Sequence, residues 1–103
     1  MTIKFKKATE VLHELIGAVS FGDFLKSLRL SLDLTQVEMA KKLKISKQDL
    51  CDIEKCRKSV SVDRAVFFAK KLKHSKKLFA KYVIEDQLRK SGLNLRVHFD
   101  EVA

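Results

Sequence analysis

Residues 35 to 57 read TQVEMAKKLKISKQDLCDIEKCR, and the rest of the chain is best interpreted around this stretch. Thr35 is a good N-cap, and the glutamate three residues later can accept a hydrogen bond from the N–H of the cap, which completes a capping box. A second helix signal begins at Ser46. Because only Lys44 and Ile45 separate the two signals, the chain must turn sharply between them, which is the geometry of a helix-turn-helix.

Apolar residues recur at helical spacing in both predicted helices, so each helix has one face that we expect to pack inward. In the first helix, residues 35 to 43, they are Val37, Met39, Ala40 and Leu43. In the second helix, residues 46 to 55, they are Leu50 and Ile53. The opposite face of the second helix is polar and remains available for a partner.

The same stretch resembles the helix-turn-helix of the Xre-like family, which includes the lambdoid phage repressors and Cro proteins. The similar positions are the Thr35-Gln36 pair, Ala40, Ile45, Leu50 and the run from Ile53 to Arg57. Residues 21 to 29 look like the first helix of that family, so the resemblance covers roughly residues 20 to 72. It implies a mainly helical, five-helix repressor-like fold that binds DNA sequence-specifically.

Two positions depart from the family pattern. The family usually has glycine where this chain has Lys44 and Cys56. Glycine adopts a left-handed backbone without a steric penalty, whereas other residues do so with some strain. Lys44 and Cys56 therefore either take up the left-handed conformation or belong to turns of a different kind.

The composition favours one small, mainly helical domain. The chain has 103 residues, 46% of them hydrophobic, with no proline and three glycines. No run approaches the roughly 20 apolar residues of a transmembrane helix, so we expect no membrane association. The N-terminus lacks the apolar core of a signal peptide, and Cys51 and Cys56 do not make a secreted disulfide framework. We therefore expect a cytoplasmic protein.

The positive charge is concentrated in one part of the chain. Residues 41 to 81 carry fourteen Lys or Arg and four Asp or Glu, a net charge of +10, within a chain whose total is +9. A lysine-rich surface that faces only solvent would give the same count. Combined with the helix-turn-helix pattern, the concentrated charge favours a nucleic acid partner.

Further segments extend the pattern on both sides of the motif. Helices are also predicted at residues 21 to 32, 61 to 73 and 75 to 90, which completes a five-helix DNA-binding domain over residues 20 to 90. The helix at residues 21 to 32 is expected to bury Phe21, Phe24, Leu25, Leu28 and Leu32. An N-terminal extension, residues 1 to 19, combines a strand pattern at residues 2 to 6 with an extra helix pattern at residues 7 to 19.

The C-terminal residues 91 to 103 contain a second strand pattern. Residues 93 to 99 alternate strictly between apolar and polar side chains. Because the backbone groups of a strand need partners, this strand would pair with residues 2 to 6 or with the same strand of a second copy. We interpret it as a dimerisation element, so a homodimer is expected.

The outer face of the helix at residues 46 to 55 supplies the candidate base-reading residues, which are Lys47, Gln48, Cys51 and Asp52. A helix of this width fits the major groove of DNA, where its N-terminal residues reach base edges. Lysine can donate to guanine, glutamine can pair with adenine, and aspartate can accept from cytosine. Cys51 is equally compatible with an unreactive surface position.

Five residues are candidates for contacts with DNA phosphates. The resemblance points to Thr35 and Gln36 at the start of the first motif helix, where free N–H groups also favour an anion. Lys55, Arg57 and Lys58, after the second motif helix, are the other candidates. Such contacts would position the protein on DNA without reading its sequence.

A structural ion pair follows from the resemblance to the phage repressors. In those proteins an arginine at the position of Arg29 pairs with a glutamate at the position of Glu54. We therefore expect a largely buried pair that links the helix at residues 21 to 32 to the helix at residues 46 to 55. The alternative is that both side chains are independent surface charges.

The leading functional hypothesis is a transcriptional regulator, expected to be a repressor, that binds an inverted repeat of double-stranded DNA as a dimer. An alternative is the antitoxin of a toxin–antitoxin pair, which would bind a small toxin protein and repress its own operon. Non-specific nucleic acid binding is a third possibility. The chain has no Gly-rich phosphate loop, HExxH or nucleophile elbow, and no metal-ligand spacing, so we expect neither an enzyme nor a cofactor.

Overall fold

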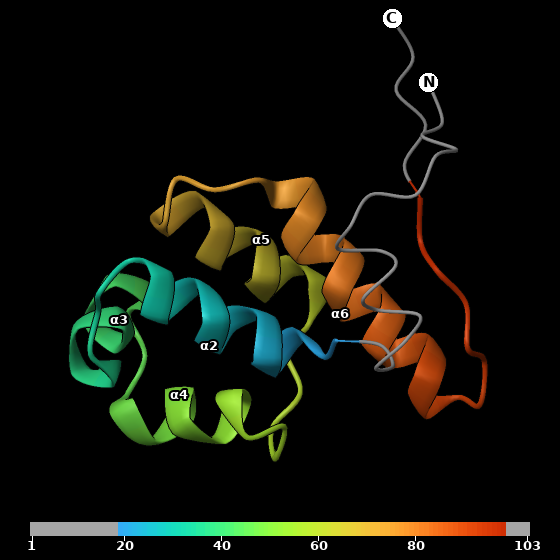
Figure 1. The fold of residues 1–103 in the computed structure, drawn as a ribbon, viewed down its shortest axis with the longest axis horizontal. Helices are drawn as coiled ribbons and strands as arrows, with labels where there is room; N and C mark the ends of the chain where they lie inside the picture. The colour runs from blue at the N-terminus through green and yellow to red at the C-terminus, as the bar shows by residue number, and fades with distance from the viewer. Residues whose placement is uncertain (1–18, 99–103) are drawn as a thin grey trace, which may run out of the picture.

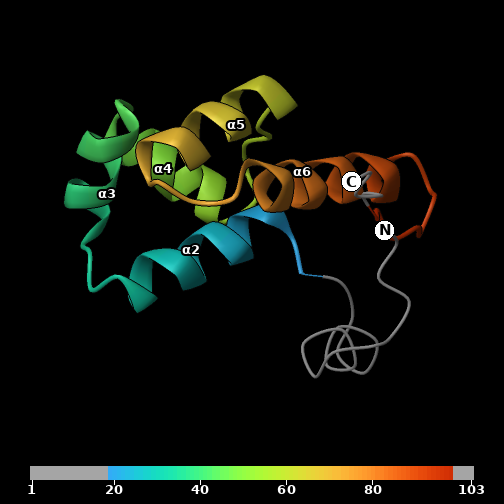
Figure 2. The same ribbon diagram turned by 90° about the horizontal axis from the view of Figure 1, so that it is seen from above.

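The computed structural model describes residues 19–98, which form five α-helices and no β-strand (Figures 1 and 2). The helices are α2 (Phe21–Ser31), α3 (Gln36–Leu43), α4 (Lys47–Glu54), α5 (Val62–Lys71) and α6 (Lys76–Lys90). A mainly helical fold is therefore confirmed. The bounds of each helix lie within two residues of those expected from the sequence.

Each helix begins after a hydroxyl residue that caps it. The caps are Ser20, Thr35, Ser46, Ser61 and Ser75. In every case the side-chain oxygen accepts a hydrogen bond from the backbone N–H three residues later, at 3.0 to 3.1 Å. These bonds satisfy N–H groups that have no partner inside the helix, so the helix starts are encoded locally.

Each helix is followed by a residue with a left-handed backbone. These residues are Asp33, Lys44, Cys56, Lys73 and Gly92. The N–H of the next residue donates to a carbonyl five positions earlier, for example from Ile45 to Ala40, which is the hydrogen bond of a Schellman motif. Lys44 and Cys56, with φ of 58° and 61°, thus keep the left-handed turn although they lack the conformational freedom of glycine.

The helices enclose one hydrophobic core. Helix α4 packs against α2 and α3, α5 packs against α3 and α6, and α2 also packs against α6. The largest fully buried apolar side chains are Leu25, Met39, Leu43, Leu50, Ile53, Phe68, Phe79 and Val83. At the α2–α6 contact, Phe24 stacks on Tyr82 with 4.4 Å between ring centroids. This core fixes α4 at one edge of the molecule, the lower edge in Figure 1.

The close contact between α2 and α4 depends on Gly22. A methyl group at this position would overlap the carbonyl oxygen of Ile53 and would lie 3.0 Å from Sγ of Cys56. Gly22 therefore lets the start of α2 touch the end of α4 directly. The requirement here is for space rather than for an unusual backbone conformation, because Gly22 lies within a helix.

Two apolar residues that we expected to face inward are exposed. Leu32, the C-cap of α2, is 47% exposed, and Val37, in the first turn of α3, is 46% exposed. Helical spacing places both near the apolar face, but each lies at a helix end, where none of the described helices covers it. The prediction that they are buried was wrong.

The strand predicted at residues 93 to 99 is not formed over residues 93 to 98, and residue 99 lies outside the described residues. The N–H of Leu93 instead caps α6 by donating to Leu88, and the N–H of Val97 donates to Oε2 of the buried Glu85 at 2.8 Å. A strand needs a neighbouring strand, and within residues 19–98 there is none. Figure 1 shows this segment as an extended trace beside α6, to which the Val97–Glu85 hydrogen bond holds it.

The predicted strand at residues 2 to 6 lies outside the described residues. The predicted helix at residues 7 to 19 also lies outside them, except for Val19, which is not helical. Among the described helices, none is both long enough and apolar enough to cross a membrane.

Candidate nucleic-acid interface

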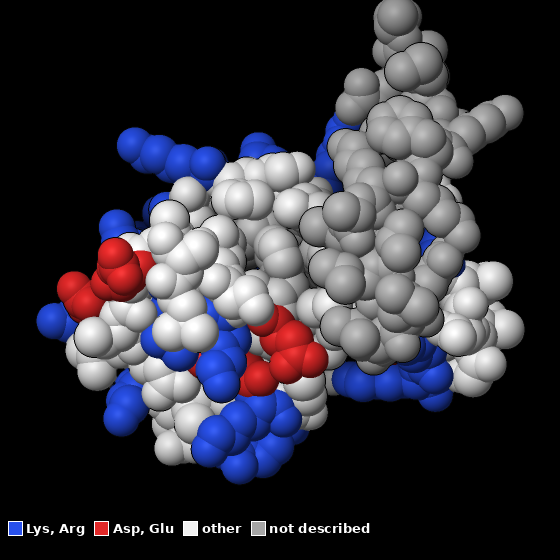
Figure 3. Space-filling view, viewed as in Figure 1, with Lys and Arg blue, Asp and Glu red and all other residues white. Residues whose placement is uncertain are grey.

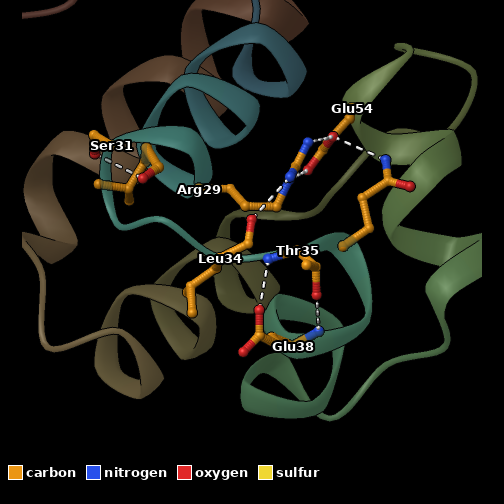
Figure 4. Close-up of polar contacts among 8 residues, drawn as sticks. Arg29, Ser31, Leu34, Thr35, Glu38 and Glu54 are labelled. Atoms are coloured by element: carbon orange, nitrogen blue, oxygen red, sulfur yellow. Dashed lines mark hydrogen bonds and ion pairs between the residues drawn. The ribbon is translucent and has the colours of Figure 1, made fainter.

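A buried ion pair joins α2 to α4. Nε of Arg29 donates to Oε2 of Glu54 at 2.7 Å, and a second guanidinium nitrogen donates to Oε1 at 3.1 Å (Figure 4). The residues are only 8% and 4% exposed, so this is the buried pair expected from the sequence rather than two surface charges. Arg29 also donates to the carbonyl of Leu34, which fixes the link between α2 and α3.

The two residues expected to contact phosphate at the start of α3 are both engaged within the protein. The Thr35 hydroxyl accepts from the N–H of Glu38, and the Glu38 carboxylate accepts from the N–H of Thr35, which is the predicted capping box (Figure 4). Nε2 of Gln36 donates to Oε1 of Glu54 at 3.1 Å. Gln36 therefore belongs to the ion-pair network, although its half-buried amide retains a second N–H. This role of Gln36 was not predicted from the sequence.

The Thr35 hydrogen bond has an electrostatic consequence. The backbone N–H of Thr35 stabilises the ionised Glu38 and holds the pKa of that carboxyl below its ordinary value of 4.5. Glu38 consequently carries its charge at the positive end of α3, where a negative charge is favourable.

The outer face of α4 presents the four candidate base-reading residues. Lys47 and Gln48 are exposed in the first turn, and Cys51 and Asp52 are half-buried one turn later. Figure 3 shows basic side chains gathered at the lower edge of the molecule, where α4 lies, with acidic side chains beside them. The surface of α4 is therefore mixed in charge and not uniformly basic.

Asp52 organises part of this face. Its Oδ1 accepts from Nε2 of Gln48 at 3.0 Å and from Nε of Arg57 at 3.2 Å. The carbonyl oxygen of Gln48 and one of its two amide N–H groups remain free of this contact. Arg57, predicted to contact phosphate, is thus folded back onto α4 in an exposed ion pair.

Asp49 organises a second group, and this group was not predicted. Nζ of Lys58 donates to its Oδ1 at 2.6 Å, and a guanidinium nitrogen of Arg64 lies 3.7 Å from its Oδ2. The hydrogen bond from Lys58 holds the pKa of the Asp49 carboxyl below its ordinary value. Arg64, in α5, was not among the candidates because it lies outside the motif, and no local pattern links it to Asp49.

The other two candidate cations have no side-chain partner within residues 19–98. Lys47 and Lys55 are exposed, and their side chains make no hydrogen bond or ion pair with any other described residue. Lys47 lies at the start of α4 and Lys55 at its end. An anion could therefore bind either ammonium group without breaking a polar contact among the described residues.

The cysteines are free thiols in different surroundings. Cys51 is half-buried, and a guanidinium nitrogen of Arg57 lies 3.9 Å from its Sγ, whereas Cys56 is exposed and lies 3.1 Å from the Ser20 hydroxyl. Among residues 19–98, no three His, Cys, Asp or Glu side chains are grouped so that they could hold a metal ion.

Comparisons with known proteins found no similar protein. No family model matches the chain, and neither the curated proteins nor the solved structures contain a significant match to it.

Proposed function

We propose that this protein is a sequence-specific DNA-binding regulator of transcription, with α3 and α4 acting as a helix-turn-helix and α4 entering the major groove. The observation that supports this proposal is the arrangement of α4. The buried Arg29–Glu54 pair fixes the inner side of α4, while Lys47 and Gln48 are exposed at its N-terminal turn. A rigid helix with polar side chains at its N-terminal end suits base reading.

The chemistry of these side chains suggests how bases would be read. Lys47, whose side chain has no partner among residues 19–98, is suited to donate to O6 and N7 of guanine. Within residues 19–98, the side-chain carbonyl oxygen of Gln48 and one of its N–H groups have no partner, so Gln48 can present an acceptor and a donor to the edge of adenine even while Asp52 holds it. Asp52 thereby limits the orientations available to the Gln48 amide.

The proposed active form is a two-fold dimer on an inverted repeat. Leu93 and Leu95 are 49% and 55% exposed on the extended segment after α6, and a second copy would cover them. Two copies would place their α4 helices in successive major grooves, about 34 Å apart along the DNA. The dimer would then set the spacing of the half-sites.

The test is fluorescence anisotropy near physiological salt, comparing a duplex from upstream of the protein's own gene with a scrambled duplex. A specific regulator is expected to prefer its own site by about a thousandfold or more. Lys47→Ala with Gln48→Ala should remove most of that preference. The matched control, Lys77→Ala with Gln87→Ala on α6, removes the same residue types from exposed positions and should retain it. Equal affinity of the wild type for both duplexes would contradict the proposal.

A second candidate function is an antitoxin that binds a small toxin and represses its own operon. The exposed Leu93 and Leu95 also support this function, because a toxin could cover them in place of a second copy. Light scattering on the purified protein, alone and with the product of any small neighbouring gene, separates the two. A stable homodimer that forms no complex with that product would contradict the antitoxin function.

A further inference from the structure

Two basic side chains from different elements meet at the first turn of α4. Lys58 comes from the loop after α4, and its Nζ reaches back to Asp49 at 2.6 Å. Arg64 comes from the first turn of α5, and its guanidinium lies 3.7 Å from the other oxygen of the same carboxylate. Sequence order suggests that Lys58 lies near the end of α4, but folding brings it to the beginning.

Arg64 is held in place but keeps its hydrogen-bond donors available. Its guanidinium lies over the ring of the buried Phe68, 5.5 Å from the ring centroid, which restricts the side chain. The distance to Asp49 is too long for a hydrogen bond, and the guanidinium donates to no other group within residues 19–98. A planar guanidinium whose N–H groups make no hydrogen bond within residues 19–98 suits the oxygens of a phosphate.

The charges of this group match one phosphate. Asp49 is ionised and Lys58 and Arg64 are cationic, so the three side chains have a net charge of +1. Their side chains are 33%, 43% and 32% exposed, so a ligand can reach all three from solvent. In the free protein, the carboxylate offsets the repulsion between the two cations and keeps them together.

We propose that Lys58 and Arg64, brought together by Asp49, form a binding site for a single phosphate of the DNA backbone. The inference rests on the proposed function and deepens it by assigning a phosphate contact next to the base-reading turn of α4. Lys58 and Arg64 donate to the phosphate oxygens, and Asp49 remains the positioning residue. A phosphate held at this point fixes how far the first turn of α4 enters the groove.

The salt dependence of DNA binding tests this site. The logarithm of the affinity falls linearly with the logarithm of the salt concentration, and each phosphate neutralised makes this slope steeper by about 0.9. Lys58→Ala and Arg64→Ala should each make that slope shallower by about 0.9. Between 50 and 200 mM salt, the DNA affinity of each variant should therefore fall about threefold less than that of the wild type. Because both residues serve one phosphate, the double variant should also lose about 0.9 rather than about 1.8.

Two further variants act as controls. Arg64→Gln retains packing on Phe68 while removing the charge, so it should reproduce the slope of Arg64→Ala even if the alanine variant is less stable. Lys77→Ala removes one exposed positive charge on α6 and should leave the slope within about 0.3 of the wild type, because a distant charge contacts no phosphate. Melting curves measured by circular dichroism confirm that each variant is folded before its DNA binding is compared.

The outcomes separate this inference from the proposed function. Sequence preference with an unchanged slope in Lys58→Ala and Arg64→Gln would overturn the phosphate site and leave the regulator intact. A double-variant loss of about 1.8 would also overturn the shared site, because each residue would then contact its own phosphate. Binding without sequence preference, but with the expected slope changes, would overturn the proposed function and leave the phosphate site standing.

Discussion

Removing Arg29 should destabilise the protein more than any surface ion-pair substitution. In Arg29→Met, the Glu54 carboxylate loses its two hydrogen bonds from the guanidinium, at 2.7 and 3.1 Å, and among the described residues it keeps only the one from Gln36. The carbonyl of Leu34 loses its donor as well. Glu54 is 4% exposed, so water cannot replace these partners without opening the α2–α4 contact.

The magnitude follows from this geometry. Hydrogen bonds to charged groups contribute about 1.5–3 kcal/mol each, and leaving one member of a buried ion pair unpaired costs about 3–5 kcal/mol. We therefore expect Arg29→Met to lower the free energy of unfolding by about 3–5 kcal/mol. Glu54→Gln keeps the shape of the side chain and one acceptor oxygen but leaves the buried Arg29 guanidinium unpaired, so a cost in the same range of about 3–5 kcal/mol is expected.

Urea denaturation followed by far-ultraviolet circular dichroism measures these free energies. The control is Arg57→Met, which breaks an exposed pair whose arginine side chain is 55% exposed, and this change should cost about 0–1 kcal/mol. In the double variant that combines Arg29→Met with Glu54→Met, the loss of unfolding free energy should be smaller than the sum of the losses in the two single variants by about 1–3 kcal/mol. The reason is that neither charge is left unpaired in the double variant. A cost of Arg29→Met no larger than that of Arg57→Met would refute the reasoning from burial.

Three other predictions concern the backbone and the carboxylates. Gly22→Ala should lower the free energy of unfolding by about 1–3 kcal/mol, because the new methyl group overlaps the Ile53 carbonyl and pushes α2 away from α4. A melting temperature equal to that of the wild type would show instead that the two helices move apart without cost. Lys44→Gly should raise the free energy of unfolding by up to about 1 kcal/mol, because glycine adopts the left-handed backbone at φ 58° without strain. Lys44→Ala, the control, should give no such increase. If urea denaturation shows equal effects for both variants, loss of the lysine charge is the cause instead. Because the pKa of Glu38 is lowered on folding, the contribution of Glu38 to stability is complete above the ordinary value of 4.5 and is lost as pH falls through the lowered pKa. Glu38→Gln should therefore flatten this part of the curve of unfolding free energy against pH. An unchanged curve would contradict the contribution of the capping box.

Much of the fold could be predicted because its signals are short-range. A cap such as Ser46 and the N–H that it accepts are three residues apart, so the helix start depends on local sequence alone. The inward faces were also recognisable, since Met39, Leu43, Leu50 and Ile53 are all buried at the expected spacing. Predictions failed where packing decides, as at Leu32 and Val37, because a periodic pattern does not show where the covering helix stops.

The candidate site divides in the same way. Lys47 and Gln48 are exposed on α4 as expected, because their direction follows from the helix period once α4 is assigned. The partners of the charged groups did not follow, since Gln36 bonds to Glu54 across 18 positions of sequence and Lys58 to Asp49 across nine. No local rule distinguishes these pairings from the many others that this charged sequence permits.

The sequence by itself determined where the helices begin, which faces pack inward and which helix presents polar side chains at the surface. Those properties depend on backbone hydrogen bonds and hydrophobic spacing within a few residues. Only the tertiary structure decided that Asp49 collects Lys58 and Arg64, and that Val97 bonds to the buried Glu85 instead of a second strand. These contacts join distant segments, and their geometry exists only once the packed core has fixed α4, α5 and α6 relative to one another.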